Sequence, residues 1–149
     1  MDYAKFNNAL NIEELKAGIE EAKSNSKEFA EIPVNRDYEV IIEAMELGES
    51  KKGDPMVKIK FKIIDGEFKN QRIWMNQVVN KGMSIHILNE FLRSLDSGVD
   101  VGFEDYQQYG TMIENIFEAI DGKFEYLLRY GQNASGYKTF SIKEVYEVE

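Results

Sequence analysis

Within the segment 56–64, residues 57–63 alternate apolar and basic side chains without a break. The apolar set is Val57, Ile59, Phe61 and Ile63, and the basic set is Lys58, Lys60 and Lys62. Because successive side chains of a β-strand point to opposite faces, this pattern predicts a strand with one apolar face and one basic face. The apolar set is expected to lie in the core, and the three lysines are called the lysine row below.

The same period of two recurs on both sides of this strand. It predicts strands over residues 38–47 and 71–79. The polar segment 49–55 predicts the first turn, and the pair Asp65-Gly66 predicts a tight hairpin turn after the second strand. Three consecutive strands on short turns indicate an antiparallel meander.

After the meander, the apolar period changes to that of a helix. The residues at helical spacing are Ile85, Leu88, Leu92 and Leu95. We expect Ser84 to cap this helix at its start and residues 96–98 to end it. Residues 111–119 are compatible with a second short helix, and strands are predicted over 124–130 and 137–145.

The first 35 residues predict a helical extension that packs on the domain or on a partner. Its apolar positions at helical spacing are Ile12, Leu15 and Ile19. Asn11 is the expected N-cap of this helix. We therefore divide the chain into an extension over residues 1–35 and a domain over residues 36–149.

The predicted order of elements is three strands, a helix and two strands. This is the order of the five-stranded OB-fold barrel, which is a mainly β fold. An open α+β sheet is the alternative. We favour the barrel, because three long strands without a covering helix bury a shared apolar face best by curling.

Composition excludes several kinds of chemistry. The chain of 149 residues has no cysteine and a single histidine, so disulfides, thiolate catalysis and zinc sites are not expected. His86 lies within the predicted helix, where a surface role is expected, and the glycines do not form a phosphate-binding loop. We expect no enzyme activity, no metal and no cofactor. No apolar run is long enough to span a membrane and no secretory signal is recognised, which favours a cytoplasmic location.

Charge is distributed unevenly along the chain. The formal net charge is −9, yet residues 51–81 hold eight basic and three acidic residues, a net charge of +5. The remainder therefore carries −14. This segregation predicts one basic surface on an acidic protein.

The third strand adds an aromatic residue to that surface. Trp74, the sole tryptophan, shares its parity with Arg72 and Asn76 and is expected beside the lysine row. Lysines along a strand with an aromatic platform are typical of single-stranded nucleic acid binding, in which each stacked base contributes about 1–3 kcal/mol. Alternating lysines also occur on solvated or protected edge strands, and a lone tryptophan also occurs in cores and subunit interfaces.

Three blocks of the sequence resemble small single-stranded-DNA-binding proteins from the replication and recombination modules of bacteriophages of Gram-positive hosts. The blocks are LGESKKGDPMVKIKFKIIDGEFKNQRIWMNQ, IHILNEFLRSLDSG and GKFEYLLRYGQNASGYKTFSIKEV. The resemblance covers about residues 37–148. It implies an OB-fold, sequence-tolerant binding of single-stranded DNA, no catalysis and self-association.

The candidate DNA-binding residues follow from charge, parity and loop position. They are Lys51, Lys52, Lys58, Lys60, Lys62, Lys69, Arg72, Trp74, Asn76, Arg129 and Tyr137. The expected partners are single-stranded DNA, further copies of this chain as a dimer or higher oligomer, and phage or host replication and recombination proteins. Membranes are not expected partners. A competing hypothesis is an acidic interaction protein that inhibits or recruits a nucleic-acid enzyme, for which the acidic remainder would be the working surface.

Overall fold

The structure is a computed structural model that describes residue 4, residues 12–24 and residues 31–148. The chain divides into two compact units, Met1–Glu31 and Ile32–Glu149. In the first unit the structure has helix α2 (Ile12–Ser24), whose first turn carries two glutamates. The expected cap at Asn11 lies outside the described residues.

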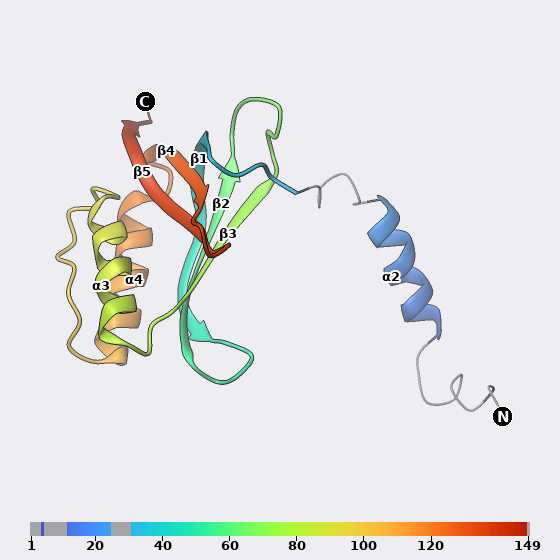
Figure 1. The fold of residues 1–149 in the computed structure, drawn as a ribbon, viewed down its shortest axis with the longest axis horizontal. Helices are drawn as coiled ribbons and strands as arrows, with labels where there is room; N and C mark the ends of the chain where they lie inside the picture. The colour runs from blue at the N-terminus through green and yellow to red at the C-terminus, as the bar shows by residue number, and fades with distance from the viewer. Residues whose placement is uncertain (1–3, 5–11, 25–30, 149) are drawn as a thin grey trace. The chain divides into compact units, whose positions relative to one another are not determined.

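Five strands of the second unit form one antiparallel sheet (Figure 1). They are β1 (Arg36–Glu49), β2 (Pro55–Ile63), β3 (Arg72–Val78), β4 (Phe124–Gln132) and β5 (Lys138–Glu147). Their order in the sheet is β3-β2-β1-β4-β5. The long strand β1 pairs with β4 through its first residues and with β2 through most of the rest, so it joins the two halves of the sheet.

The sheet is open, which corrects our expectation of a closed barrel. Within residues 31–148, β3 and β5 are edge strands and do not pair with each other. Phe61 of β2 and Phe140 of β5 stack with ring centroids 6.0 Å apart, although β1 and β4 lie between their strands in the sheet. The sheet is therefore curled. Helix α3 (Gly82–Arg93) contacts both edge strands, and its Phe91 packs edge-on against Phe61. A helix therefore helps to bury the inner face, and the strand order is compatible with an OB-fold.

The connection between β2 and β3 is longer than the two-residue turn that Asp65-Gly66 predicts. The backbone amide of Asn70 donates to the carbonyl of Ile63 at 2.8 Å, so the loop spans residues 64–71. Gly66 and Asn70 both have positive φ angles, of 91° and 74°. These left-handed positions let the longer loop close, and the loop length sets the pairing register of β3.

Two helices separate β3 from β4, in the regions where the sequence predicts one helix and is compatible with a second. Ser84 does not cap α3: Lys81 occupies the N-cap position without a side-chain cap, and the Ser84 hydroxyl donates to the Lys81 carbonyl at 2.8 Å. Helix α4 (Tyr106–Ile120) is longer than the expected segment 111–119. It begins at the cap of Asp105, whose carboxylate accepts from the Gln108 amide at 2.7 Å.

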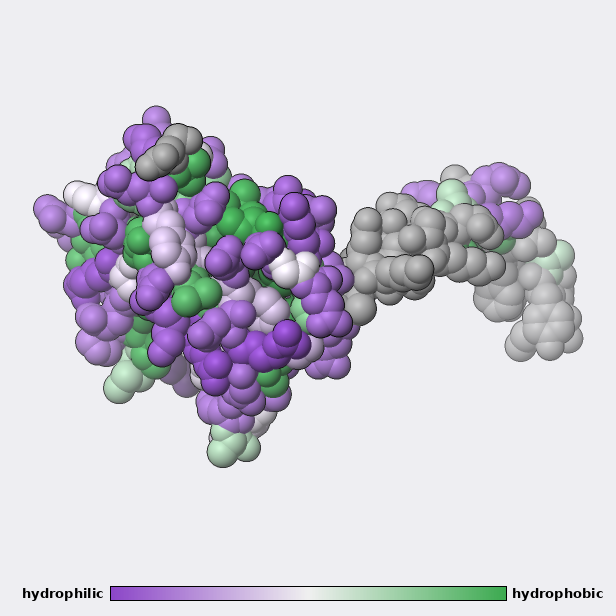
Figure 2. Space-filling view, turned by 90° about the horizontal axis from the view of Figure 1, so that it is seen from above, coloured by the Kyte–Doolittle hydropathy of each residue, from purple (hydrophilic) through white to green (hydrophobic). Residues whose placement is uncertain are grey.

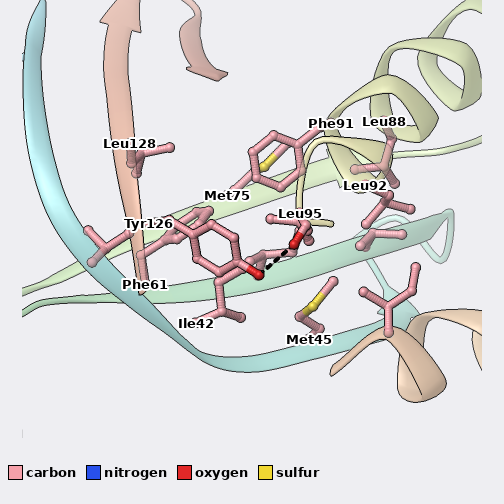
Figure 3. Close-up of a cluster of buried hydrophobic side chains, with 14 of the residues drawn as sticks. Ile42, Met45, Phe61, Met75, Leu88, Phe91, Leu92, Leu95, Tyr126 and Leu128 are labelled. Carbon is pink, nitrogen blue, oxygen red and sulfur yellow. Dashed lines mark hydrogen bonds between the residues drawn. The ribbon is translucent and has the colours of Figure 1, made fainter. Parts of the chain in front are cut away.

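The core lies between the curled sheet and the helices (Figure 3). Its contributors include Ile42, Met45, Phe61, Met75, Leu88, Phe91, Leu92, Leu95, Tyr126 and Leu128. Tyr126 is fully buried, and its hydroxyl donates to the carbonyl of Leu95 at 2.8 Å. Burial raises the pKa of Tyr126, so it stays neutral and satisfies one carbonyl beyond the end of α3.

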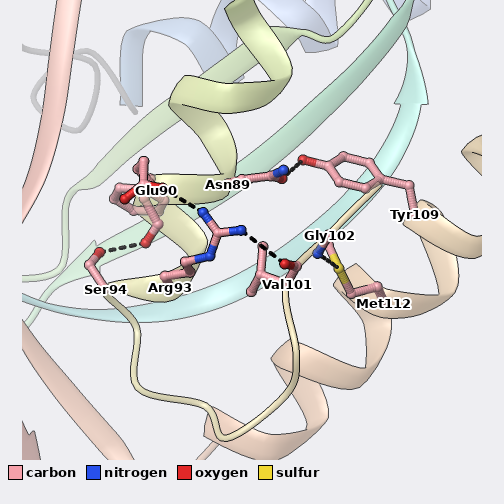
Figure 4. A network of polar contacts seen from close by, with 9 residues as sticks. Asn89, Glu90, Arg93, Ser94, Val101, Gly102, Tyr109 and Met112 are labelled. Carbon is pink, nitrogen blue, oxygen red and sulfur yellow. Dashed lines mark hydrogen bonds and ion pairs between the residues drawn. The ribbon is translucent and has the colours of Figure 1, made fainter. Parts of the chain in front are cut away.

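Polar contacts connect α3 to α4 and to the loop between them (Figure 4). The buried Tyr109 hydroxyl donates to the Asn89 side-chain oxygen at 2.6 Å, and burial raises the pKa of Tyr109 to about 12. Arg93 donates to the carbonyl of Val101 at 3.0 Å. These bonds hold the two helices and the loop between them together, while the helices pack on the buried face of the sheet, opposite the lysine row.

The outer surface of the second unit is mainly hydrophilic in the view of Figure 2, where hydrophobic residues appear only as separate small patches. In the part of the chain that the structure describes, no helix is both long and apolar enough to cross a membrane. No group of three or more potential metal ligands occurs among the described residues.

Candidate nucleic-acid interface

The alternation in β2 divides its side chains between the core and the surface, as predicted. Val57, Ile59, Phe61 and Ile63 have no exposed area, while the lysine row is partly exposed on the other side. On β3, Ile73 and Met75 are buried. We call the outward residues of these two strands the β2–β3 outer face: Lys58, Lys60, Lys62, Arg72, Trp74 and Asn76.

The register brings these six residues into three cross-strand pairs. Lys58 lies opposite Asn76, Lys60 opposite Trp74, and Lys62 opposite Arg72. Directly opposite side chains on one face are the closest neighbours across a sheet. The structure therefore brings together all six of the predicted residues on β2 and β3.

Trp74 lies on the surface of the second unit, so its interpretation as a core residue is wrong. Its side chain is 53% exposed. The Lys60 ammonium lies 5.4 Å from the centroid of its ring, within the range of a cation–π interaction. A large aromatic ring exposed to solvent is a candidate contact surface, and the neighbouring cation suits an anionic ligand.

Glu43 is a residue of this face that our sequence reasoning missed. The register between β1 and β2 shifts at Glu43, because Ile42 pairs with Phe61 and Ala44 pairs with Lys60. Such a bulge can redirect a side chain. Here the Glu43 carboxylate accepts from Arg72 twice, at 3.0 Å from Nε and 2.9 Å from Nη2, and lies 3.4 Å from the Lys60 ammonium.

The two cations change the ionisation of Glu43. Partial burial would raise its pKa, but the hydrogen bonds and positive charges of Arg72 and Lys60 outweigh that effect and lower it below the ordinary value of 4.5. Glu43 is therefore a carboxylate at neutral pH. Two of the cations on the β2–β3 outer face thus have an acidic partner from β1.

The other two lysines of the row differ from Lys60 in this respect. Within residues 31–148, neither Lys58 nor Lys62 forms an ion pair with a carboxylate. The Lys58 ammonium lies beside Gly48 of β1, where a Cβ in place of the glycine hydrogen would stand 3.5 Å from it. The Lys58 ammonium therefore lies over the backbone of β1 and has no ion-pair partner among residues 31–148.

The remaining predicted residues lie away from the face. Lys51 and Lys52 are exposed in the β1–β2 turn, at the Lys58 end of the lysine row, and Lys69 is exposed in the loop at the opposite end. These positions can extend the basic surface along the strand direction.

Arg129 and Tyr137 are not adjacent to the lysine row. Arg129 points outward from β4, which is separated from β2 by β1, and it lies 3.4 Å from the carboxylate of Asp37. Tyr137 is 73% exposed in the β4–β5 turn. The structure thus places these two predicted residues in separate positions.

The outer surface of the sheet also has an acidic half. The carboxylates on the outward positions of β1, β4 and β5 include Glu39, Glu46, Glu125 and Glu144. The basic segment and the acidic remainder predicted from sequence thus meet along β1. A polyanion approaching the sheet is attracted by one half and repelled by the other.

The ion pairs of Glu43 should make the stability of the domain depend on pH. Glu43→Gln should lower the free energy of unfolding by about 0.2–1 kcal/mol at pH 7. Because the folded state lowers the pKa of Glu43, this contribution is complete above the unfolded value of 4.5 and is lost as the pH falls through the folded value. Urea unfolding of both proteins between pH 7 and pH 3 should show the difference shrinking below about 4.5. A difference that stays constant over this range would contradict the assignment.

The comparisons with known proteins give a family without an assigned activity. No curated protein matches the sequence. The model of the family described as "Protein of unknown function (DUF669)" matches residues 19–116, about two thirds of the chain. The matched segment contains β1, β2, β3 and α3, and with them the whole β2–β3 outer face and Glu43. The chain belongs to the DUF669 family.

Proposed function

We propose that this protein binds single-stranded DNA on the β2–β3 outer face, with little sequence preference. The observation that carries the proposal is the pairing of exposed Trp74 with Lys60 in the middle of a row of lysines. Aromatic rings stack on bases of any sequence, while lysines neutralise the phosphates. No side chain on this face needs to react with the ligand, so the role is binding without catalysis.

The spacing of the lysine row suits an extended polymer. Alternate residues of a strand are about 6.7 Å apart, so the three ammonium groups can follow successive charges of a backbone laid along β2. Trp74 stands beside the middle lysine, where a base can be stacked while its neighbouring phosphates contact Lys58 and Lys62. Such contacts give affinity without reading base edges.

The order of the strands supports the same location. In OB-folds, oligonucleotides bind on the face of strands 2 and 3 and on the loops between strands 1 and 2 and between strands 4 and 5. Here the first of these loops holds Lys51 and Lys52, and the second holds Tyr137. We assign the domain to the OB-fold as part of this proposal, with the curled but open sheet as a variant of the barrel.

The biological setting that we propose is the protection and presentation of single-stranded DNA during bacteriophage replication or recombination in the cytoplasm of a bacterial host. It rests on the resemblance of residues 37–148 to phage single-stranded-DNA-binding proteins. Self-association and contacts with replication or recombination proteins belong to the same proposal.

Removing the ring of Trp74 should weaken binding without unfolding the domain. Trp74→Ala should reduce affinity for labelled oligo(dT) by about 1–3 kcal/mol, because one stacking contact is lost. Its melting temperature should change little, since the side chain is exposed. Tyr146→Ala is a matched control that removes an exposed ring from the acidic half of the sheet. Equal affinities for the two variants would move the site away from Trp74.

Lys58 and Lys62 should account for part of the salt dependence. Each phosphate neutralised on single strands contributes a log–log slope of about −0.7, so Lys58→Gln with Lys62→Gln should flatten the slope by about 1.4. The control is Lys123→Gln with Lys143→Gln, which removes the same charge from positions off the β2–β3 outer face. Fluorescence anisotropy at several salt concentrations measures both slopes.

Two results would count against the lysine assignment. An unchanged slope in the Lys58 and Lys62 variant would show that neither lysine contacts phosphate. An absence of binding by the wild-type protein even at low salt would contradict the proposed function itself and favour the acidic interaction protein.

A further inference from the structure

Glu43 occupies the position at which a DNA phosphate would otherwise meet two cations of the β2–β3 outer face. Its two carboxylate oxygens hold Nε and Nη2 of Arg72 at 3.0 and 2.9 Å, and one of them lies 3.4 Å from the Lys60 ammonium. Arg72 also donates through Nη1 to the carbonyl of Asn70. Donors on all three guanidinium nitrogens therefore have partners before any ligand arrives.

The Glu43 carboxylate binds the Arg72 guanidinium in the geometry that an external anion such as a phosphate would use. A carboxylate accepts two parallel hydrogen bonds from a guanidinium in the same way as a phosphate does, so the two compete for the same donors. Glu43 lies at the bulge of β1 and reaches across β2 to a side chain of β3. A glutamate at a regular outward position would be directed at its direct cross-strand neighbour instead.

We propose that Glu43 is an internal competitor of the nucleic-acid backbone, which sets the affinity of the β2–β3 outer face by occupying Lys60 and Arg72. This inference rests on the proposed function. It divides the cations of the face into two classes. Within the described residues, Lys58 and Lys62 have no carboxylate partner and can take phosphates directly, whereas Lys60 and Arg72 can do so only when Glu43 releases them.

The consequence is a weaker but more readily reversible contact. While Glu43 holds its partners, the three groups carry a net charge of +1 instead of +2, and less counterion is released when DNA binds. Lys60 is also kept beside Trp74, with its ammonium 5.4 Å from the ring centroid, so the stacking ring remains flanked by charge in the free protein.

The test replaces the carboxylate with its neutral isostere. Glu43→Gln keeps the shape but removes the charge, so it should bind oligo(dT) about two- to fivefold more tightly at low salt, in line with the size of an exposed ion pair. Its log–log salt slope should steepen by about 0.7, because one more phosphate is neutralised. Glu43→Asp, which keeps the charge, should stay closer to the wild type than Glu43→Gln does.

Glu46→Gln is the matched control. Glu46 lies on the same strand and on the same outer side, with its Cα paired to that of Lys58, but it forms no ion pair within residues 31–148. The Glu46→Gln substitution removes the same unit of negative charge from the same surface as Glu43→Gln does. If the gain came only from lowering the overall negative charge, Glu46→Gln would give as large an increase as Glu43→Gln, and the proposal would be wrong.

Testing Glu43→Gln in a second protein, which lacks both cations, separates competition with the DNA backbone from a structural role of Glu43. In a protein with Lys60→Gln and Arg72→Gln, adding Glu43→Gln should change affinity by less than about twofold, because the competed cations are absent. A full gain in that background would overturn the proposal. Thermal melting of each variant verifies that the compared proteins are folded at the assay temperature.

The outcomes distinguish this inference from the proposed function. If the wild type binds and Glu43→Gln binds equally or more weakly, Glu43 is not a competitor, although the face still binds DNA. If only Glu43→Gln binds, Glu43 blocks the face, and the proposed function of the wild type is contradicted. If neither protein binds at low salt, both proposals fail.

Discussion

Strand β2 buries one of its two faces completely, and this constraint places the lysine row of the candidate interface on the outer surface of the sheet. Its four apolar residues have no exposed area and belong to the core, where Phe61 packs against Phe91 of α3. A slip of one residue in the pairing would send these side chains into water and the lysines into the core. The core therefore holds the lysine row on the outer surface, and the register with β3 holds Trp74 there with it.

The acidic character of the chain has a consequence at this surface. The basic β2–β3 outer face borders β1, which contributes Glu39, Glu43 and Glu46 to the outward side. Carboxylates next to a cationic face confine a polyanion to that face and repel it elsewhere. Glu43 differs from the other two, because the bulge in β1 brings its carboxylate within bonding distance of the cations.

Periodicity predicted the strands, and it predicted the division of β2 and β3 between core and surface because alternate residues of these two strands are buried. It predicted less where local structure depends on distant contacts. The Asp65-Gly66 pair indicated a two-residue turn, but the loop extends to residue 71, where Asn70 takes a positive φ. The start of α4 was missed because residues 106–110 are aromatic, polar or glycine, and their helical role depends on the Asp105 cap and on the buried Tyr109 with its bond to Asn89.

The candidate site was predicted in part for the same reason. Parity identified Arg72, Trp74 and Asn76 as neighbours of the lysine row, and the register brings them together. Parity also places Glu43 on the outward side of its strand, yet its bonds to Lys60 and Arg72 require the bulge, at which the buried positions of β1 change from Ile42 to Met45. Arg129 and Tyr137 were grouped with the lysines although they lie on β4 and in the β4–β5 turn, and β1 separates β4 from that row.

The central claim is that the β2–β3 outer face binds single-stranded DNA. Trp74 is the sole tryptophan of the chain, so its fluorescence reports on this face alone. A titration of the wild-type protein with oligo(dT) at low salt measures base stacking on that ring directly. We predict saturable quenching of the Trp74 emission that is reversed by added salt. Emission that stays unchanged while the oligonucleotide binds would contradict the account, because the DNA would then lie on another surface.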